Sequence, residues 1–173
     1  MSYDEKLLAL ASRQLFEGGA FLMSGLEEQN PMTIGWAQFG RVWGLPMCTV
    51  FVRHSRHSFK LMEKDDVFTV SFPLDGAMKK ELGFCGTNSG RDTDKKAQIG
   101  AGVVPARAGA VAGLAGCKLH VECRLRYKLD MVGHMEPLYE GIRDEYYKPG
   151  ERQSDNGDPH MLYFGEILDV YEV

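Results

Sequence analysis

The sequence predicts a mainly β protein with added helices, in which short strands form a small barrel and helices plug or cover it. Residues 118–129 give the strongest support, because apolar and polar side chains alternate as in an antiparallel strand with one face in water. Other short apolar segments are separated by turn residues and by helical patterns. A Gly-x-Gly-x-x-Gly motif and a regular strand–helix–strand alternation are both missing, which argues against a dinucleotide-binding α/β fold.

The composition is that of an ordinary globular protein. The 173 residues fit one domain, and 44% of them are hydrophobic and 25% charged. A net charge of -4 and a pI of about 5.7 disfavour nucleic acid or a membrane surface as partner, so any anion site must be built locally. The N-terminus lacks the pattern of a secretion signal and no apolar run reaches the length of a membrane span, so a cytoplasmic location is expected.

In the first half of the chain, a helix is expected over residues 4–16, where apolar side chains share one stripe that ends before two glycines. Four strands are expected from β-branched and aromatic residues bounded by turn residues: 20–25, 31–39, 47–53 and 67–72. Residues 41–44 are expected to form a turn. A helix is expected over residues 58–64, with Ser55 or Ser58 as its N-cap.

In the second half, helices are expected over residues 75–82 and 92–99, the second capped by Asp92, with a glycine-rich loop between them. Residues 100–116 show no clear pattern. Strands 118–129 and 161–173 flank a polar, aromatic-containing insertion at residues 137–159. The four cysteines contain no Cys-x-x-Cys pair, which favours buried, reduced thiols.

The first candidate site lies where a strand ends and a helix begins. Two arginines and two hydroxyls meet free helix N-terminal amides there: Arg53, Ser55, Arg56 and Ser58. A phosphate fits such a place by charge, by bidentate hydrogen bonding and by the helix dipole. A solvated basic turn with capping serines explains the pattern equally well. The two histidines within it have no third ligand at motif spacing, so exposed turn histidines are expected rather than a metal site.

The second candidate site is the glycine-rich stretch at residues 85–95. It contains Ser89 and Gly90, and the spacing of Arg91 and Lys95 places both cations on one face of the expected helix. Exposed amides and two cations can hold an anion. The alternative is a capped surface helix whose own aspartates neutralise its cations.

The third candidate site is the strand at residues 30–36. Thr33, the bare backbone at Gly35 and the indole of Trp36 can line a flat heterocycle. The alternative is a core strand with a structural tryptophan. Motifs for a nucleophile with its base, such as Gly-x-Ser-x-Gly or His-Glu-x-x-His, are missing, so no catalytic residue and no metal ligand is predicted.

The order of these motifs resembles that of the flavin reductase-like family, which has the FMN-binding split-barrel fold, and most of all its flavoredoxin-like branch. The resemblance covers roughly residues 20–172. The motifs that carry it are Asn30-x-Met32-Thr33-x-x-Trp36, Val52-Arg53-x-Ser55-Arg56, Phe68-Thr69-Val70-Ser71-Phe72, Cys85-Gly86-x-x-Ser89-Gly90-Arg91-Asp92-x-Asp94-Lys95 and His160-x-Leu162-Tyr163-x-Gly165-Glu166.

The resemblance implies a single domain over residues 1–173, built as a six-stranded antiparallel split barrel, and a homodimer with FMN between the barrel and its neighbour. Carried over by motif, the phosphate would be bound by Arg53, Ser55, Arg56 and Ser58. Thr33 and Trp36 would lie along the isoalloxazine. Ser89, Gly90, Arg91 and Lys95 would also approach the cofactor.

The expected function is therefore that of an FMN-binding oxidoreductase, which passes electrons from NADH, NADPH or a redox protein partner through FMN to an acceptor. Two alternatives stay open: an FMN electron carrier without a substrate of its own, and a flavin-free split-barrel binding module. The N-terminal helix and the 137–159 insertion depart from the family pattern, so the resemblance does not carry over a substrate.

Overall fold

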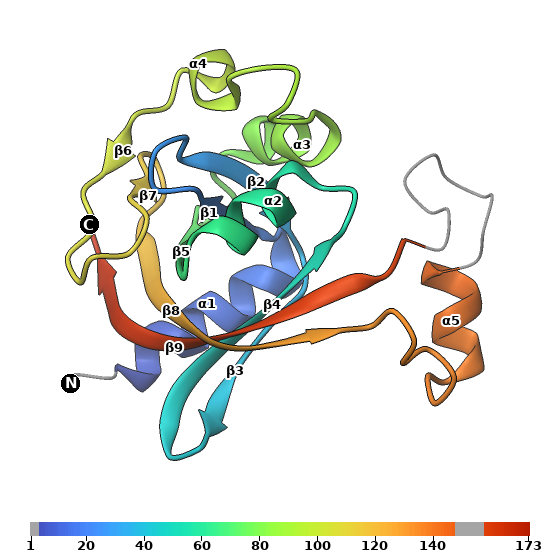
Figure 1. Cartoon of the computed structure of the whole chain (residues 1–173). Helices are drawn as coiled ribbons and strands as arrows, with labels where there is room; N and C mark the ends of the chain where they lie inside the picture. The colour runs from blue at the N-terminus through green and yellow to red at the C-terminus, as the bar shows by residue number, and fades with distance from the viewer. Residues whose placement is uncertain (1–3, 148–157) are drawn as a thin grey trace.

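A computed structural model describes residues 4–147 and 158–173, and its main element is one strongly curved antiparallel sheet (Figure 1). The strands lie in the order β2-β1-β5-β8-β9-β4-β3. Their bounds are Ala20–Ser24 (β1), Asn30–Ile34 (β2), Ala37–Val42 (β3), Leu45–Arg53 (β4), Val67–Phe72 (β5), Leu119–Asp130 (β8) and His160–Glu172 (β9). A small second sheet pairs Val103–Val104 (β6) with Gly113–Leu114 (β7). The mainly β, antiparallel prediction is confirmed.

The sheet closes on itself at Gly35 and Trp36. These two residues alone join β2 to β3, yet β2 and β3 are the two edges of the seven-stranded sheet. Because so short a link cannot span an open sheet, the sheet rolls until its edges meet. The expected strand at residues 31–39 is therefore wrong as one strand. Its division into β2 and β3 accounts for seven strands where six were predicted.

The β3–β4 hairpin turn is shorter than expected. Its two central residues are Trp43 and Gly44, with φ of 53° and 77°. A two-residue turn with positive φ at both positions matches the right-handed twist of the flanking strands. The predicted turn at 41–44 is thus confined to its last two residues, and Arg41 lies within β3.

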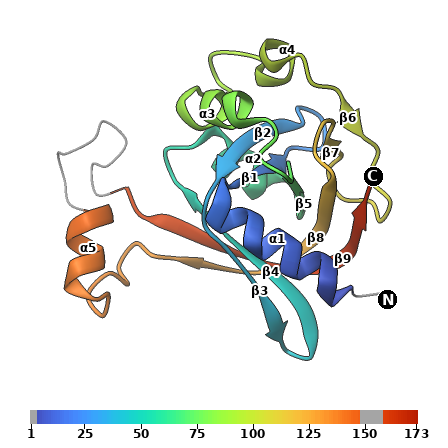
Figure 2. The same ribbon diagram turned by 180° about the vertical axis from the view of Figure 1, so that it is seen from behind.

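The longest strands, β8 and β9, form a hairpin that extends beyond the barrel. They pair with each other over their whole length, and irregularities at Glu122/Cys123 and Leu125/Tyr127 help the sheet to curl. A short helix at the far end of this hairpin, Glu140–Tyr146 (α5), lies away from the barrel body in both views (Figures 1 and 2). It belongs to the expected insertion at 137–159, of which residues 148–157 lie outside the described part of the chain.

The N-terminal helix forms as the sequence predicts, over Glu5–Glu17 (α1). The Asp4 side chain accepts hydrogen bonds from the amides of Lys6 and Leu7, and the helix ends at Gly18. Its buried side, which contains Leu8 and Ala11, packs on the barrel against β3 and β9 (Figure 2). Among the described helices, none has the length and apolar character needed to cross a membrane.

The other helices differ from expectation at their ends. They are His57–Lys64 (α2), Lys79–Thr87 (α3) and Lys95–Ile99 (α4). Arg56 occupies the N-cap position of α2 without a capping side-chain bond, so the prediction of a serine cap is wrong. Asp94 caps α4 through the Ala97 amide, so the cap predicted at Asp92 is also wrong. Positive φ at Asp75, Gly76 and Met78 delays α3, which then runs through two glycines expected in a loop.

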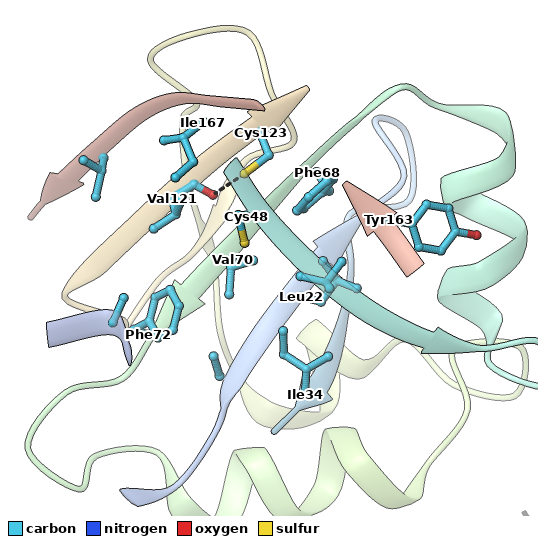
Figure 3. Packing of buried hydrophobic residues seen from close by; sticks show 14 of the residues in the cluster. Leu22, Ile34, Cys48, Phe68, Val70, Phe72, Val121, Cys123, Tyr163 and Ile167 are labelled. Carbon is cyan, nitrogen blue, oxygen red and sulfur yellow. Dashed lines mark hydrogen bonds between the residues drawn. The ribbon is translucent and has the colours of Figure 1, made fainter. Parts of the chain in front are cut away.

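The barrel interior is filled by tightly packed apolar side chains, among them Phe68, Phe72 and Tyr163 (Figure 3). Gly165 of β9 is required for this packing, because a Cβ there would lie 2.5 Å from the Phe68 ring. All four cysteines are free and buried, as the sequence predicts, and Cys48 and Cys123 belong to the same core (Figure 3).

The outside of the barrel is covered where β1, β5 and β8 run together. A second apolar cluster joins β1 and β5 to α3 and to the chain around Val111 and Leu114. His120 and Glu122 are therefore fully buried. The solvent-exposed face predicted for this strand exists only in the second half of β8. The Glu122 carboxylate accepts the amides of Arg107 and Ala108 at 2.6 and 2.8 Å, which ties this cover to the sheet.

His120 makes folding stability sensitive to acid. Burial lowers the pKa of His120 from 6.5 to about 4, so the folded protein holds it neutral where the unfolded chain takes up a proton. Stability conferred by the neutral form is present above pH 6.5 and is lost as the pH falls from about 6.5 towards 4. We expect the wild type to lose roughly 2–3 kcal/mol more than His120→Asn between pH 7 and 4.5. Urea unfolding at stepped pH measures this, and parallel curves would contradict it.

Candidate functional site

The predicted site residues line two adjoining cavities on one side of the barrel. A polar cavity of about 110 Å³ lies between the start of α2 and the segment joining α3 to α4. A middle cavity of about 250 Å³ lies next to it, and the two share Met32 and Arg56. The polar cavity brings together Ser55, Arg56, Ser58, Ser89, Gly90, Arg91 and Lys95. The middle cavity brings together Thr33, Trp36, Arg53 and Arg56.

The turn between β4 and α2 already receives a carboxylate. The Ser55 amide donates to both carboxylate oxygens of Asp158 at 3.3 Å. This turn is closed by the Arg56 amide, which donates to the carbonyl of Arg53 at 3.0 Å. A main-chain amide beside a helix N-terminus and two arginines is a favourable place for a negative charge. The turn thus binds an anion, and in this structure that anion is a side chain of the protein.

The opposite wall of the polar cavity is formed by Ser89, Gly90 and Arg91. The Arg91 guanidinium donates to the carbonyl of Ser55 at 2.5 Å, which joins the two walls. Arg91 precedes α4, so the prediction that it shares a helical face with Lys95 is wrong. A Cβ on Gly90 would lie 2.2 Å from Asn30 Oδ1, so only glycine allows this close approach.

Lys95 is a buried cation at the base of the polar cavity, with 4% of its surface exposed. Its ammonium donates to the carbonyls of Pro31 and Cys85, both at 3.0 Å. An ammonium carries three N–H bonds, and these carbonyls use two of them. Burial lowers the pKa of Lys95; the Cys85 thiol opposes this shift, and the nearby Arg56 adds to it. Because this positive charge is shielded from solvent, it favours a negatively charged ligand beside it.

Ser58 and Arg56 are held by neighbouring elements. The buried Ser58 hydroxyl accepts a hydrogen bond from the Asn30 side-chain amide at 2.9 Å, which ties α2 to β2. The Arg56 guanidinium donates to the carbonyl of Gly86 at 3.0 Å. The bond to Gly86 fixes the direction of the Arg56 side chain, which lies on the border between the two cavities.

The middle cavity has an aromatic side and a cationic side. The Trp36 indole contacts the rings of Tyr146 and His160, with centroids 5.0 Å away in both cases. Arg53 donates to the carbonyls of Asp158 and Tyr146 at 2.7 and 3.0 Å. The Thr33 hydroxyl donates to the carbonyl of Leu82 at 2.6 Å, so it anchors α3. The cavity therefore offers an aromatic platform beside fixed positive charge.

His160 is neutral in this environment. Burial lowers its pKa to about 3, and Arg53, Arg56 and His54 act in the same direction. Its Nδ1 lies 2.8 Å from the Tyr147 hydroxyl, which sets the direction of the ring. His160 thus contributes a flat, uncharged surface to the middle cavity.

The histidines of the β4–α2 turn are not the exposed side chains that the sequence predicts. Most of each side chain is covered, and each faces a carboxylate. His54 Nε2 lies 3.2 Å from Asp130, and His57 Nε2 lies 2.7 Å from Glu28. Within residues 4–147 and 158–173, no group of three or more His, Cys, Asp or Glu side chains is arranged to hold a metal ion.

Sequence reasoning missed the part of the site that comes from distant segments. Tyr146 ends α5, and Asp158 precedes β9 by two residues, so no local motif connects them with the turn they contact. His160 belongs to a motif that carried the family resemblance but was given no role. The only signal was that Tyr146 and Asp158 belong to the insertion and that His160 directly follows it.

Comparison with known proteins identifies the family. Residues 16–173 match the family described as flavin reductase like domain, and the chain belongs to that family. The flavoredoxin of Methanosarcina acetivorans is similar in structure, with 22% identity, a TM-score of 0.65, and coverage of 90% of this chain and 68% of that one. Comparison with curated proteins gives no match.

Two further structures are similar. The FMN-binding protein of Thermus thermophilus has 22% identity and a TM-score of 0.62, over 90% of this chain and 70% of that one. The NADH:FAD oxidoreductase SgcE6 of Streptomyces globisporus has 16% identity and a TM-score of 0.62, over 100% of this chain and 87% of that one. At these identities the likeness shows the fold, while the family match indicates a flavin-related oxidoreductase.

Two glycine substitutions test the packing of the polar cavity. Gly90→Ala forces a methyl group onto Asn30 and His57, and we expect a loss of about 1–3 kcal/mol in unfolding free energy. Gly83→Ala is the matched control, because it lies inside α3 with open space around its Cβ position; we expect a gain of about 0.5–1 kcal/mol. Denaturant unfolding measures both. Similar effects of the two changes would show that Gly90 is not confined.

Proposed function

We propose that the protein binds FMN and acts as an oxidoreductase, passing electrons from NADH, NADPH or a redox protein partner through FMN to an acceptor. One observation carries this proposal: the residues predicted for cofactor binding line two adjoining cavities, one anion-binding and one aromatic. FMN has the same two ends, a phosphate and a flat isoalloxazine. The redox chemistry is that of the flavin, and the protein supplies position and polarity.

The polar cavity suits the phosphate. The Ser55 amide, the guanidinium groups of Arg56 and Arg91 and the ammonium of Lys95 supply hydrogen bonds and positive charge from different elements. Charge-assisted bonds of this kind are the strong ones in phosphate recognition. A terminal phosphate monoester fits a cavity of about 110 Å³. This favours FMN over a dinucleotide flavin, whose adenosine would have to continue past the phosphates.

The middle cavity suits one part of the flavin ring system. The Trp36 indole and the uncharged His160 ring supply apolar surface. Gly35 leaves bare backbone at the same place, and its Cβ position has no neighbour within 4 Å. Hydrogen bonds between main chain and ring edge need this kind of access.

We further propose that the active unit is a cytoplasmic homodimer. Exposed aromatic side chains beside the β3–β4 hairpin support pairing: the ring of Trp43 lies edge-on to that of Tyr127, and 63% and 47% of their surfaces are exposed. Aromatic residues are enriched in protein interfaces. The mass of the protein in solution, measured by light scattering, tests this directly.

The visible spectrum of the purified protein tests the main proposal. Addition of FMN should shift the flavin absorption bands until they saturate, and anaerobic NADH or NADPH should then bleach them. Flavin binding without bleaching would indicate a carrier that receives electrons from a protein. A protein that leaves the flavin spectrum unchanged would overturn the proposal in favour of a flavin-free binding module.

Arg56→Ala should weaken FMN binding by about tenfold or more while it weakens riboflavin binding much less. The physical reason is that riboflavin lacks the phosphate, and a hydrogen bond to a charged group contributes about 1.5–3 kcal/mol. Fluorescence titration of both ligands gives the ratio. Arg41→Ala on the exposed part of β3 is the control and should change neither affinity. An equal loss for both ligands at Arg56 would mean that this arginine serves the fold.

Asp158→Asn should have the opposite effect and tighten FMN binding by about twofold to tenfold. The carboxylate on the Ser55 amide competes with the phosphate, and an uncharged amide competes less. Riboflavin affinity should stay the same. Asp144→Asn on α5 removes the same charge without touching the turn and is the matched control. Weaker FMN binding in Asp158→Asn would show that the carboxylate supports the site.

A further inference from the structure

A third cavity, the aromatic groove, lies on the other side of Trp36. Its volume is about 640 Å³, within the range of about 300–1,000 Å³ that is typical of small-molecule sites. The last turns of α1 form one wall, and β3 and β4 form the other. The apolar side chains of the lining are Leu15, Phe16, Trp36, Ala37, Phe39 and Phe51.

The groove is uncharged. Among the described residues that line it there is no Asp, Glu, Lys, Arg or His, and the polar side chains are Ser12 and Gln38. A nicotinamide dinucleotide carries a pyrophosphate that would find no cation here. The lining instead fits a flat, uncharged molecule whose edge oxygens can accept hydrogen bonds from a hydroxyl and an amide.

The groove is continuous with the proposed cofactor site. Gly35, Trp36 and Phe51 line both the groove and the middle cavity. The polar cavity lies beyond the middle cavity, so the groove adjoins the ring end of the proposed cofactor site and is remote from its phosphate end. A molecule in the groove would therefore lie beside the part of the site where electrons are exchanged.

Phe16 stands at the edge of the groove with 93% of its surface exposed. The side of α1 that packs on the barrel contains Leu8, Ala11 and Gln14 instead. A flat ligand in the groove would cover part of the Phe16 ring. Removal of this apolar surface from water favours binding. Leu10, on the same helix, is also exposed, but it lines a different cavity.

We propose that the aromatic groove binds a flat, uncharged aromatic molecule of the quinone class, which serves as the electron acceptor of the protein. The acceptor role rests on the proposed flavin function. In it, the reduced flavin gives two electrons and two protons to the quinone, which leaves as the hydroquinone, while the flavin returns to its oxidised form. The binding role requires only the groove residues.

Tryptophan fluorescence tests the binding role without any flavin. The chain contains two tryptophans, so Trp43→Phe leaves Trp36 as the only reporter, and Trp36 lies in the groove wall. Menadione, a methylated naphthoquinone, should quench its emission in a saturable manner. N-acetyltryptophanamide corrects for absorption by the quinone and for collisional quenching. Linear, unsaturable quenching equal to that of the free amide would overturn the proposal, as would a groove closed by a second copy of the chain.

Two variants in the Trp43→Phe background locate the binding. Phe16→Ala should weaken menadione binding at least fivefold, whereas Leu10→Ala, the matched exposed apolar residue of α1, should leave it unchanged. Equal effects of the two changes would overturn the assignment to the groove. FMN affinity should be the same in both variants. Saturable menadione binding by a protein that takes up no FMN would leave the groove assigned and would refute only the flavin function.

Discussion

The two-residue link at Gly35 and Trp36 is the constraint on which the site depends. It joins β2 to β3, the two edges of the sheet, and along this seam β2 and the end of β4 line the middle cavity together. The exposed backbone of an edge strand needs partners. Here Lys95 donates to the carbonyl of Pro31 in β2, and Thr33 binds α3. The burial of Lys95 thus follows from barrel closure, because this lysine supplies a hydrogen bond to the edge strand. Its positive charge then lies beside the polar cavity.

The charges around the seam are unbalanced in favour of cations, although the whole chain carries a net charge of -4. Arg56 and Lys95 are close enough for one to lower the pKa of the other. Like charges in a half-buried place disfavour each other unless an anion lies between or beside them. The Asp158 carboxylate on the Ser55 amide supplies one negative charge. A phosphate, with more charge and more acceptor oxygens, would satisfy the same donors more fully.

Local patterns predicted the segments of the site, and long-range contacts decided the rest. The β4–α2 turn could be predicted because its residues are consecutive. Sequence could not show that residues 31–39 divide at Gly35, because strand propensity carries no information about barrel closure. His120 and Glu122 looked solvent-exposed because the segment that covers them, residues 107–114, showed no clear pattern in the sequence. The cap of α4 was placed two residues early because Asp92 and Asp94 are equally good caps by residue type.

Two additions to the barrel control access to the site from opposite ends. Arg53 ties the insertion to the turn by donating to the carbonyls of Tyr146 and Asp158, and the Tyr146 and Trp36 rings contact each other edge to face. Any ligand that enters the middle cavity must therefore fit beside the insertion or move it. The end of α1 meets the same tryptophan from the groove side. Because both additions converge on Trp36, they decide what reaches the proposed cofactor site, while the barrel carries most of the residues proposed to hold the cofactor.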